Sequence, residues 1–221
     1  MIDDRIVTLR VGDTSNGSTR DFSIHEAILA EYSPYFRAAL DEKWRECSRV
    51  MELPFDDIDI VAAYAHWLYF KRVASKLISP PKLSMDDGEF LMLARLYCFG
   101  EKVQDEAFCD GVITAMTLKT YDVAEDGTRI FPGHCAVMAL YNGTTKNSIS
   151  RKFMVDMYCE FGMDLWIPEE AELNHPEFLA DLVRAFLGGR KSIVPHMQTN
   201  FPRRRTWHKR QQSRDGVSTG V

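Results

Sequence analysis

The sequence lacks any long apolar run and any apolar leader. No stretch approaches the roughly 20 consecutive apolar residues that a helix needs to cross a bilayer, so we expect no transmembrane segment. The first five residues, MIDDR, are acidic and contain no apolar signal core. We therefore expect an intracellular protein, cytoplasmic or nuclear, with no membrane partner.

Paired cysteines and the common catalytic motifs are also missing. The five cysteines are Cys47, Cys98, Cys109, Cys135 and Cys159. None forms a CxxC pair, which favours reduced thiols over a disulfide framework or a zinc site. There is no glycine-rich phosphate loop, and no His/Cys set has metal-ligand spacing. We expect no cofactor, no metal and no catalytic residue, and hence no enzyme.

What is present is ordinary globular composition with an uneven charge. Apolar residues make up 45% and charged residues 27% of the 221 residues, enough to bury a sizeable core. Residues 1–189 hold 19 Lys and Arg against 31 Asp and Glu, a balance of −12. Residues 190–221 hold 8 basic residues and one acid, a balance of +7, which gives the net charge of −5. An acidic body with a basic tail makes nucleic-acid binding unlikely except through the tail.

The first half predicts a small sheet with helices inserted into it. Alternation of apolar residues indicates strands over residues 6–11 and 20–24, joined by a long turn, and a third strand over residues 49–54. Ser23 and Glu26 have the S-x-x-E form of a capping box, which predicts a helix over about 25–32. Ser33 before Pro34 predicts that a second helix starts at once, with Ser33 as its cap.

Helices alone follow the third strand. A helical stripe of Ile60, Tyr64, Trp67 and Leu68 predicts a helix after Asp57, and further helices are predicted over about 86–103, 105–117, 134–141, 147–161 and from 174 to 187. We interpret the stripe of Met and aromatic residues at 153–161 as core packing, with a partner groove as the alternative. This order of elements is α+β.

One stretch of the first half carries a resemblance. Residues 22–36, FSIHEAILAEYSPYF, contain an aromatic, a histidine, a small apolar cluster ending in Leu, and then Ser-x-aromatic-Phe. This resembles the signature of BTB/POZ domains, as do the following VxxLP and WLY motifs in their order. The resemblance covers about residues 5–118 and includes fungal-type members with a helical remainder, although Glu26 stands where a basic residue commonly follows the histidine.

The resemblance implies a fold and a division of the chain. It implies a BTB/POZ-like domain at 1–120, in which a small, mainly antiparallel sheet caps a cluster of helices, then a helical extension at 121–190 and a basic tail at 191–221. Within the motif, His25, Ser33 and Phe36 are interpreted as structural. For His25 this means a buried, hydrogen-bonded side chain rather than a ligand or a base.

The resemblance also implies a protein–protein interaction module. Many such domains are adaptors for cullin-type ubiquitin ligases, in which a hydrophobic-x-Glu motif follows the second short helix and contacts the cullin. Trp44 and Glu46 stand at that place here. The alternative is a Trp packed on the edge of the domain beside a solvated Glu. Many such domains also form homodimers through the N-terminal strand, but only about five residues precede it in this chain.

The basic tail supports a second interpretation. Its cluster consists of Arg203, Arg204, Arg205, Lys209 and Arg210. This cluster is typical of a nuclear import signal or a nucleic-acid contact, and equally of a solvated end. The alternative to a ligase adaptor is therefore a nuclear regulatory scaffold that uses the tail.

Overall fold

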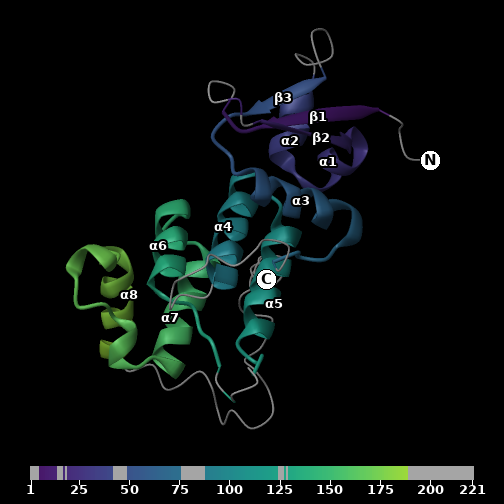
Figure 1. Ribbon diagram of the computed structural model, residues 1–221. Helices are drawn as coiled ribbons and strands as arrows, with labels where there is room; N and C mark the ends of the chain where they lie inside the picture. Colours follow the sequence, from purple (N-terminus) through teal and green to yellow (C-terminus); the bar gives the residue numbers. More distant parts are fainter. Residues whose placement is uncertain are drawn as a thin grey trace, which may run out of the picture.

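The computed structural model describes residues 5–13, 17, 19–41, 49–75, 88–123, 127 and 129–188. A three-stranded sheet lies at one end of the molecule, and the helices extend from it (Figure 1). Its strands are β1 (Ile6–Val11), β2 (Arg20–His25) and β3 (Val50–Leu53), in the order β2-β1-β3. The helices of the first half are α1 (Glu26–Tyr32), α2 (Pro34–Leu40), α3 (Ile58–Phe70), α4 (Gly88–Lys102) and α5 (Glu106–Lys119).

The C-terminal helices form a second group. They are α6 (His134–Gly143), α7 (Ile149–Phe161) and α8 (Pro176–Leu187), with two 3-10 turns, η3 (Asp164–Trp166) and η4 (Ala171–Leu173), between the last two. The predicted α+β class with additional helices is confirmed. In the part of the chain that the structure describes, no helix is both long and apolar enough to span a bilayer.

The sheet is mixed, and the longer of its two ladders is antiparallel. β1 and β2 are antiparallel, with Ile6 opposite His25, and β1 and β3 are parallel, with Thr8 opposite Val50. Between β1 and β3 the chain runs back along β2 and then through α1 and α2, so β3 starts at the same end as β1. Val7, Leu9 and Val11 are buried on one face of β1, as their alternation predicts.

The predicted capping box at Ser23 is wrong. Ser23 lies in β2 opposite Thr8, and the strand continues to His25, so the helix cannot begin before Glu26. His25 is the N-cap of α1 and makes no side-chain capping bond. The backbone N–H of Glu26 instead donates to the carbonyl of Arg5 at 2.9 Å, and the two side chains form an ion pair at 3.4 Å. Strand pairing has therefore displaced the local cap.

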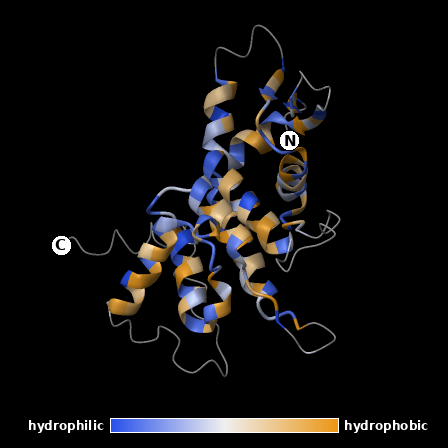
Figure 2. Cartoon of the chain, turned by 60° about the vertical axis from the view of Figure 1, so that its left-hand side comes forward, coloured by the Kyte–Doolittle hydropathy of each residue, from blue (hydrophilic) through white to orange (hydrophobic). Residues whose placement is uncertain are grey.

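Helix α4 is the element that both groups of helices share. It packs against α3 and α5 on the side of the sheet and against α6 on the other side. Eight of its fifteen residues are buried, and a helix that is apolar around most of its circumference belongs inside a structure. In Figure 2 the helices that meet near the middle of the molecule carry orange, apolar residues beside blue ones.

The predicted core stripes are confirmed. Ile60, Tyr64, Trp67 and Leu68 of α3 are all buried. The Met and aromatic stripe of α7 is core as well: Phe153, Met154, Met157 and Tyr158 are buried, and Phe161 packs against the core. The partner-groove alternative for this stripe is therefore wrong.

Candidate protein-interaction surface

Ser33 joins the α1–α2 elbow to the end of α4. Its side chain is fully buried. The hydroxyl accepts a hydrogen bond from the backbone N–H of Phe36 at 3.1 Å and donates one to the carbonyl of Val103 at 2.5 Å. The predicted cap is thus confirmed, and it has a second role that local sequence did not indicate: it holds α2 against a residue 70 positions away.

Phe36 anchors α2 in an aromatic cluster. Its side chain is fully buried and lies 6.4 Å, centroid to centroid, from Tyr64 of α3. Tyr64 makes edge contacts with Phe99 of α4 at 5.2 Å and Phe108 of α5 at 5.0 Å. Such aromatic pairs add stabilisation beyond the area they bury. The structural role predicted for Phe36 is confirmed.

His25 links the end of β2 to the end of α3. Its ring Nδ1 lies 2.8 Å from the hydroxyl oxygen of Tyr69, and its backbone N–H donates to the same oxygen at 3.0 Å. The predicted hydrogen-bonded structural role is confirmed, although the side chain is half-buried rather than buried. The Tyr69 hydroxyl therefore holds both the ring and the backbone of His25 at the junction between β2 and α1.

Asp105 is a buried carboxylate that the sequence analysis did not single out. It is the N-cap of α5, accepting the backbone N–H of Phe108 at 2.8 Å and the hydroxyl of Tyr64 at 3.2 Å. Burial is the largest effect on its carboxyl and raises its pKa, against the hydrogen bonds. An Asp just before a helical apolar stripe is a capping signal, but nothing local indicates its burial.

An open groove lies beside these residues. It has a volume of about 580 Å³ and runs between the α1–α2 elbow and the α4–α5 connection. Its lining residues are Glu31, Tyr32, Pro34, Arg37, Glu101, Gln104, Asp105, Glu106 and Ala107. The Arg37 guanidinium is occupied by the carbonyls of Ala30 and Glu31, at 2.7 and 3.2 Å. Carboxylates therefore outnumber cations among the residues that line this groove.

Among the described residues of the first half, two aromatic side chains are much more exposed than the others. Phe55, in the turn after β3, is 96% exposed, and Phe70, at the end of α3, is 65% exposed. The ring of Phe70 rests on His66 at 4.6 Å. Exposed aromatic residues are suited to anchor a protein partner. Neither side chain could be predicted to be exposed from the sequence, because an isolated aromatic residue in a turn or at a helix end belongs to no hydrophobic periodicity.

The structure does not describe the residues that the sequence analysis predicted for a cullin interface and for a nuclear import signal. Trp44, Glu46 and the basic cluster at 203–210 lie outside the described residues. Within the described ranges, no group of three or more His, Cys, Asp or Glu side chains is placed to hold a metal ion.

The comparison with protein families identifies the first half. A BTB/POZ domain model matches residues 7–105, from the second residue of β1 to the N-cap of α5. These residues are a BTB/POZ domain, a domain of protein–protein interaction rather than catalysis. The chain is therefore a BTB/POZ domain-containing protein. No curated protein matches the sequence.

Proposed function

We propose that the protein is a substrate adaptor for a cullin-type ubiquitin ligase. The observation that carries the proposal is the BTB/POZ domain at 7–105, together with the hydrophobic-x-Glu motif of Trp44 and Glu46. The motif follows α2, which ends at Leu40, as it does in cullin-binding relatives. A large aromatic beside a carboxylate suits an interface anchor, because aromatic burial dominates binding hot spots.

The shared helix α4 fits this function. An adaptor has to hold a substrate-binding part at a set distance from the ligase. Here α6 packs directly on α4 and α7–α8 pack on one another, so the C-terminal helices are attached by a packed interface rather than by a linker alone. We assign substrate binding to these helices, and no catalytic role to any part of the chain.

The test is a cullin pull-down with the Trp44→Ala variant of the full chain. We expect binding to be lost and the melting temperature to stay close to that of the unchanged protein. Phe186→Ala is the matched control, because Phe186 is an exposed aromatic of α8, outside the BTB/POZ domain. If Trp44→Ala unfolds the protein, Trp44 belongs to the core; if the unchanged protein binds no cullin, the ligase role is wrong.

A nuclear regulatory scaffold without a ligase role is the second candidate. The sequence feature that favours it is the basic cluster of Arg203, Arg204, Arg205, Lys209 and Arg210. Residues 199–214 fused to a fluorescent protein should then give a nuclear signal, and deletion of 203–210 from the full chain should abolish it. A diffuse signal from the fusion would contradict this candidate.

Self-association is a further part of the proposal. BTB/POZ domains commonly pair, and the exposed edge positions of a small sheet can extend across two copies. Light scattering at micromolar concentration should give twice the mass of one chain, 25.4 kDa. A single-chain mass across that range would contradict a homodimer.

A further inference from the structure

A second pocket lies in the helical extension, away from the BTB/POZ domain. It has a volume of about 510 Å³ and opens between the start of α7 and the last turns of α8. Its walls are Lys146, Asn147, Ser148, Arg151, Lys152, Val155, Asp181, Arg184, Ala185 and Gly188. Side chains from two helices and the turn before α7 therefore converge on one space.

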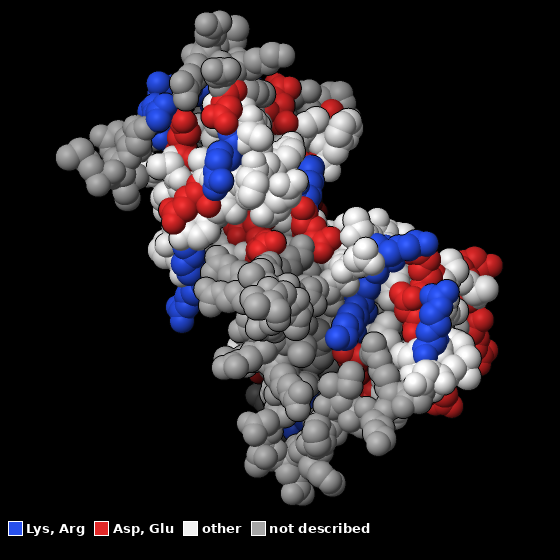
Figure 3. All heavy atoms as spheres, turned by 180° about the vertical axis from the view of Figure 1, so that it is seen from behind, with Lys and Arg blue, Asp and Glu red and all other residues white. Residues whose placement is uncertain are grey.

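The pocket is electropositive although the body of the protein is acidic. Four cations line it, Lys146, Arg151, Lys152 and Arg184, against the carboxylates of Asp181 in its wall and Glu177 beside it. The carboxylate of Glu101, which accepts the hydroxyl of Ser148 at 2.8 Å, lies beside it as well, so one positive charge is in excess. In Figure 3 long basic side chains stand beside acidic ones on the lobe at the right of the view, where the C-terminal helices lie.

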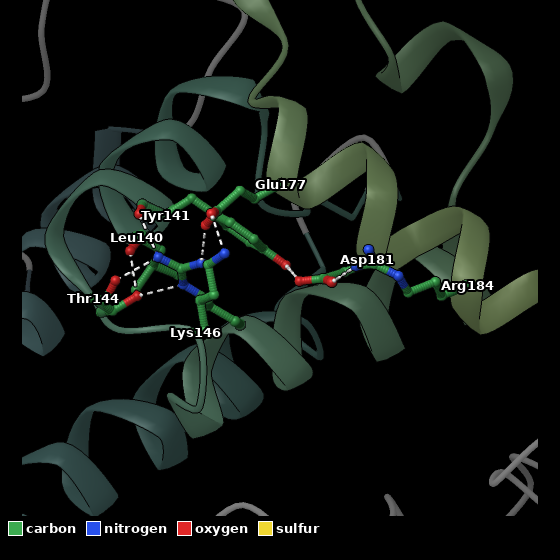
Figure 4. A network of polar contacts seen from close by, with 8 residues as sticks. Leu140, Tyr141, Thr144, Lys146, Glu177, Asp181 and Arg184 are labelled. Atoms are coloured by element: carbon green, nitrogen blue, oxygen red, sulfur yellow. Dashed lines mark hydrogen bonds and ion pairs between the residues drawn. The ribbon is translucent and has the colours of Figure 1, made fainter.

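Arg151 is the fixed cation of the pocket. Its side chain is only 6% exposed. The guanidinium donates to Glu177 at 2.6 Å, to the carbonyl of Tyr141 at 2.7 Å, to the hydroxyl of Thr144 at 3.1 Å and to the carbonyl of Thr144 (Figure 4). These bonds occupy four of its five N–H groups, so Arg151 chiefly supplies a positive charge that is held in place.

The donors available to a ligand come from the exposed cations. The Lys152 side chain has no ion-pair partner within the described part of the chain and is exposed. Lys146 and Arg184 are 81% and 75% exposed, and they form ion pairs with Glu177 at 3.1 Å and with Asp181 at 2.9 Å. Each therefore keeps further N–H groups for a second acceptor.

The first turn of α7 adds to the same potential. Ser148 is its N-cap but makes no capping bond. Its hydroxyl donates to Glu101 at 2.8 Å and lies 2.8 Å from that of Ser150. The first amide groups of this 13-residue helix therefore keep their positive end at the pocket.

We propose that this pocket binds a phosphomonoester dianion carried by a phosphorylated segment of a partner protein. The inference rests on the protein being an interaction module, and it names the chemistry of a partner. The exposed N–H groups of Lys146, Lys152 and Arg184 suit the three acceptor oxygens of a phosphomonoester better than the two of a carboxylate. A long polyanion such as a nucleic acid suits the site less, because the balance of −12 over residues 1–189 repels it.

The test is an NMR titration of the full chain with a seven-residue Gly/Ser peptide that carries one phosphoserine. We expect saturable shifts in the amide signals of residues 147–152 and 184–185, and none from the unphosphorylated peptide. In Lys152→Gln/Arg184→Gln, affinity should fall roughly tenfold or more, because charge-assisted bonds to phosphate are lost.

Arg95→Gln is the matched control. Arg95 is an exposed cation of α4 with a long contact of 3.9 Å to Asp57, and its removal should leave affinity unchanged. Equal losses in both variants, shifts spread over the whole surface, or no shift would overturn the phosphate site. Tighter binding of a 12-nucleotide single strand at the same amides would overturn the choice of partner. The cullin pull-down is independent, so each proposal can fail alone.

Discussion

The BTB/POZ domain and the helical extension hold their interior polar groups in different ways. In the domain, Ser33 and Asp105 are paired with backbone groups and with the phenol of Tyr64. In the extension, the buried Arg151 pairs with the carboxylate of Glu177, and the exposed Lys146 and Arg184 add ion pairs with Glu177 and Asp181 (Figure 4).

This difference has a physical consequence. Short hydrogen bonds to backbone groups inside the domain are shielded from solvent and depend little on salt. The ion pairs of the extension lie partly in water, where mobile ions weaken them. We therefore expect the stability of the interior of the domain to depend less on salt and pH than the stability of the extension.

The largest expected effect comes from Phe36→Ala, which breaks the domain. Removing a fully buried ring that stacks on Tyr64 should cost about 3–5 kcal/mol of unfolding free energy. Denaturant unfolding followed by circular dichroism measures it. Tyr35→Ala is the matched control, because Tyr35 is 37% exposed. Similar losses in the two variants would contradict the assigned packing of Phe36.

Arg151→Ala should break the extension with a somewhat smaller effect. Two buried carbonyls, those of Tyr141 and Thr144, lose their donor, so we expect a loss of roughly 2–4 kcal/mol. Hydrogen exchange should quicken in α6–α8 before it quickens in the sheet. Lys152→Ala, at the neighbouring exposed position, should leave exchange unchanged. Uniform loosening would show that the two regions unfold as one.

Gly143→Ala tests the contact between α4 and α6. A Cβ on Gly143 would lie 2.5 Å from the Sγ of Cys98, and overpacking of this kind costs about 1–3 kcal/mol. The side chain of Cys98 is held in place because its thiol donates to the carbonyl of Ala139 at 3.4 Å. Burial raises the pKa of this thiol to about 12, so it stays protonated and keeps this donor. Adding Cys98→Ala removes the Sγ but leaves the Cβ of residue 98 at 2.9 Å, so part of the lost melting temperature should return; no recovery would contradict the close approach.

The smallest expected effect is that of acid, which should destabilise the extension more than the domain. Burial lowers the pKa of His175, and Arg151 and then Lys146 lower that of Glu177. The stability these two groups contribute is present above their unfolded pKa values, about 6.5 and 4.3, and is lost as pH falls through the folded values. The pKa of Asp105 is raised. The stability that this carboxyl contributes is therefore present at low pH and is lost as pH rises through its folded pKa, the opposite of the behaviour of His175 and Glu177.

Hydrogen exchange at pH 7 and pH 5, corrected for intrinsic rates, measures this contrast. Protection should fall in α6–α8 and hold in the domain. His175→Gln should flatten the change between pH 7 and 5, because the imidazole Nδ1 is buried without a hydrogen-bond partner. Equal changes of protection in the domain and in α6–α8 would contradict the expected difference in their pH dependence.

Sequence reasoning identified the elements of the fold better than the contacts between them. Periodicity placed the strands and helices, and the cap at Ser33 was read correctly because its partner Phe36 is three residues away. The cap predicted at Ser23 failed because pairing with β1 outweighed a local hydrogen bond. The parallel pairing of β3 with β1 could not be predicted either, because it depends on the path of the chain through α1 and α2 and not on the local sequence of β3.

The candidate sites were harder to predict for the same reason. The contact between Arg151 and Glu177 joins residues 26 positions apart, and that between Tyr64 and Asp105 joins residues 41 apart. Neither spacing is a motif. The basic pocket could not be found from the overall charge, because its four cations lie in a stretch whose total is acidic.

The sharing of α4 bears on how the chain emerges from the ribosome. Once about 120 residues have been released, the sheet and α1–α5 are complete, but the side of α4 that carries Cys98 has no cover until α6 follows. Nascent chains halted at that length should recruit chaperones that recognise apolar surface, and release them when the next helix is made.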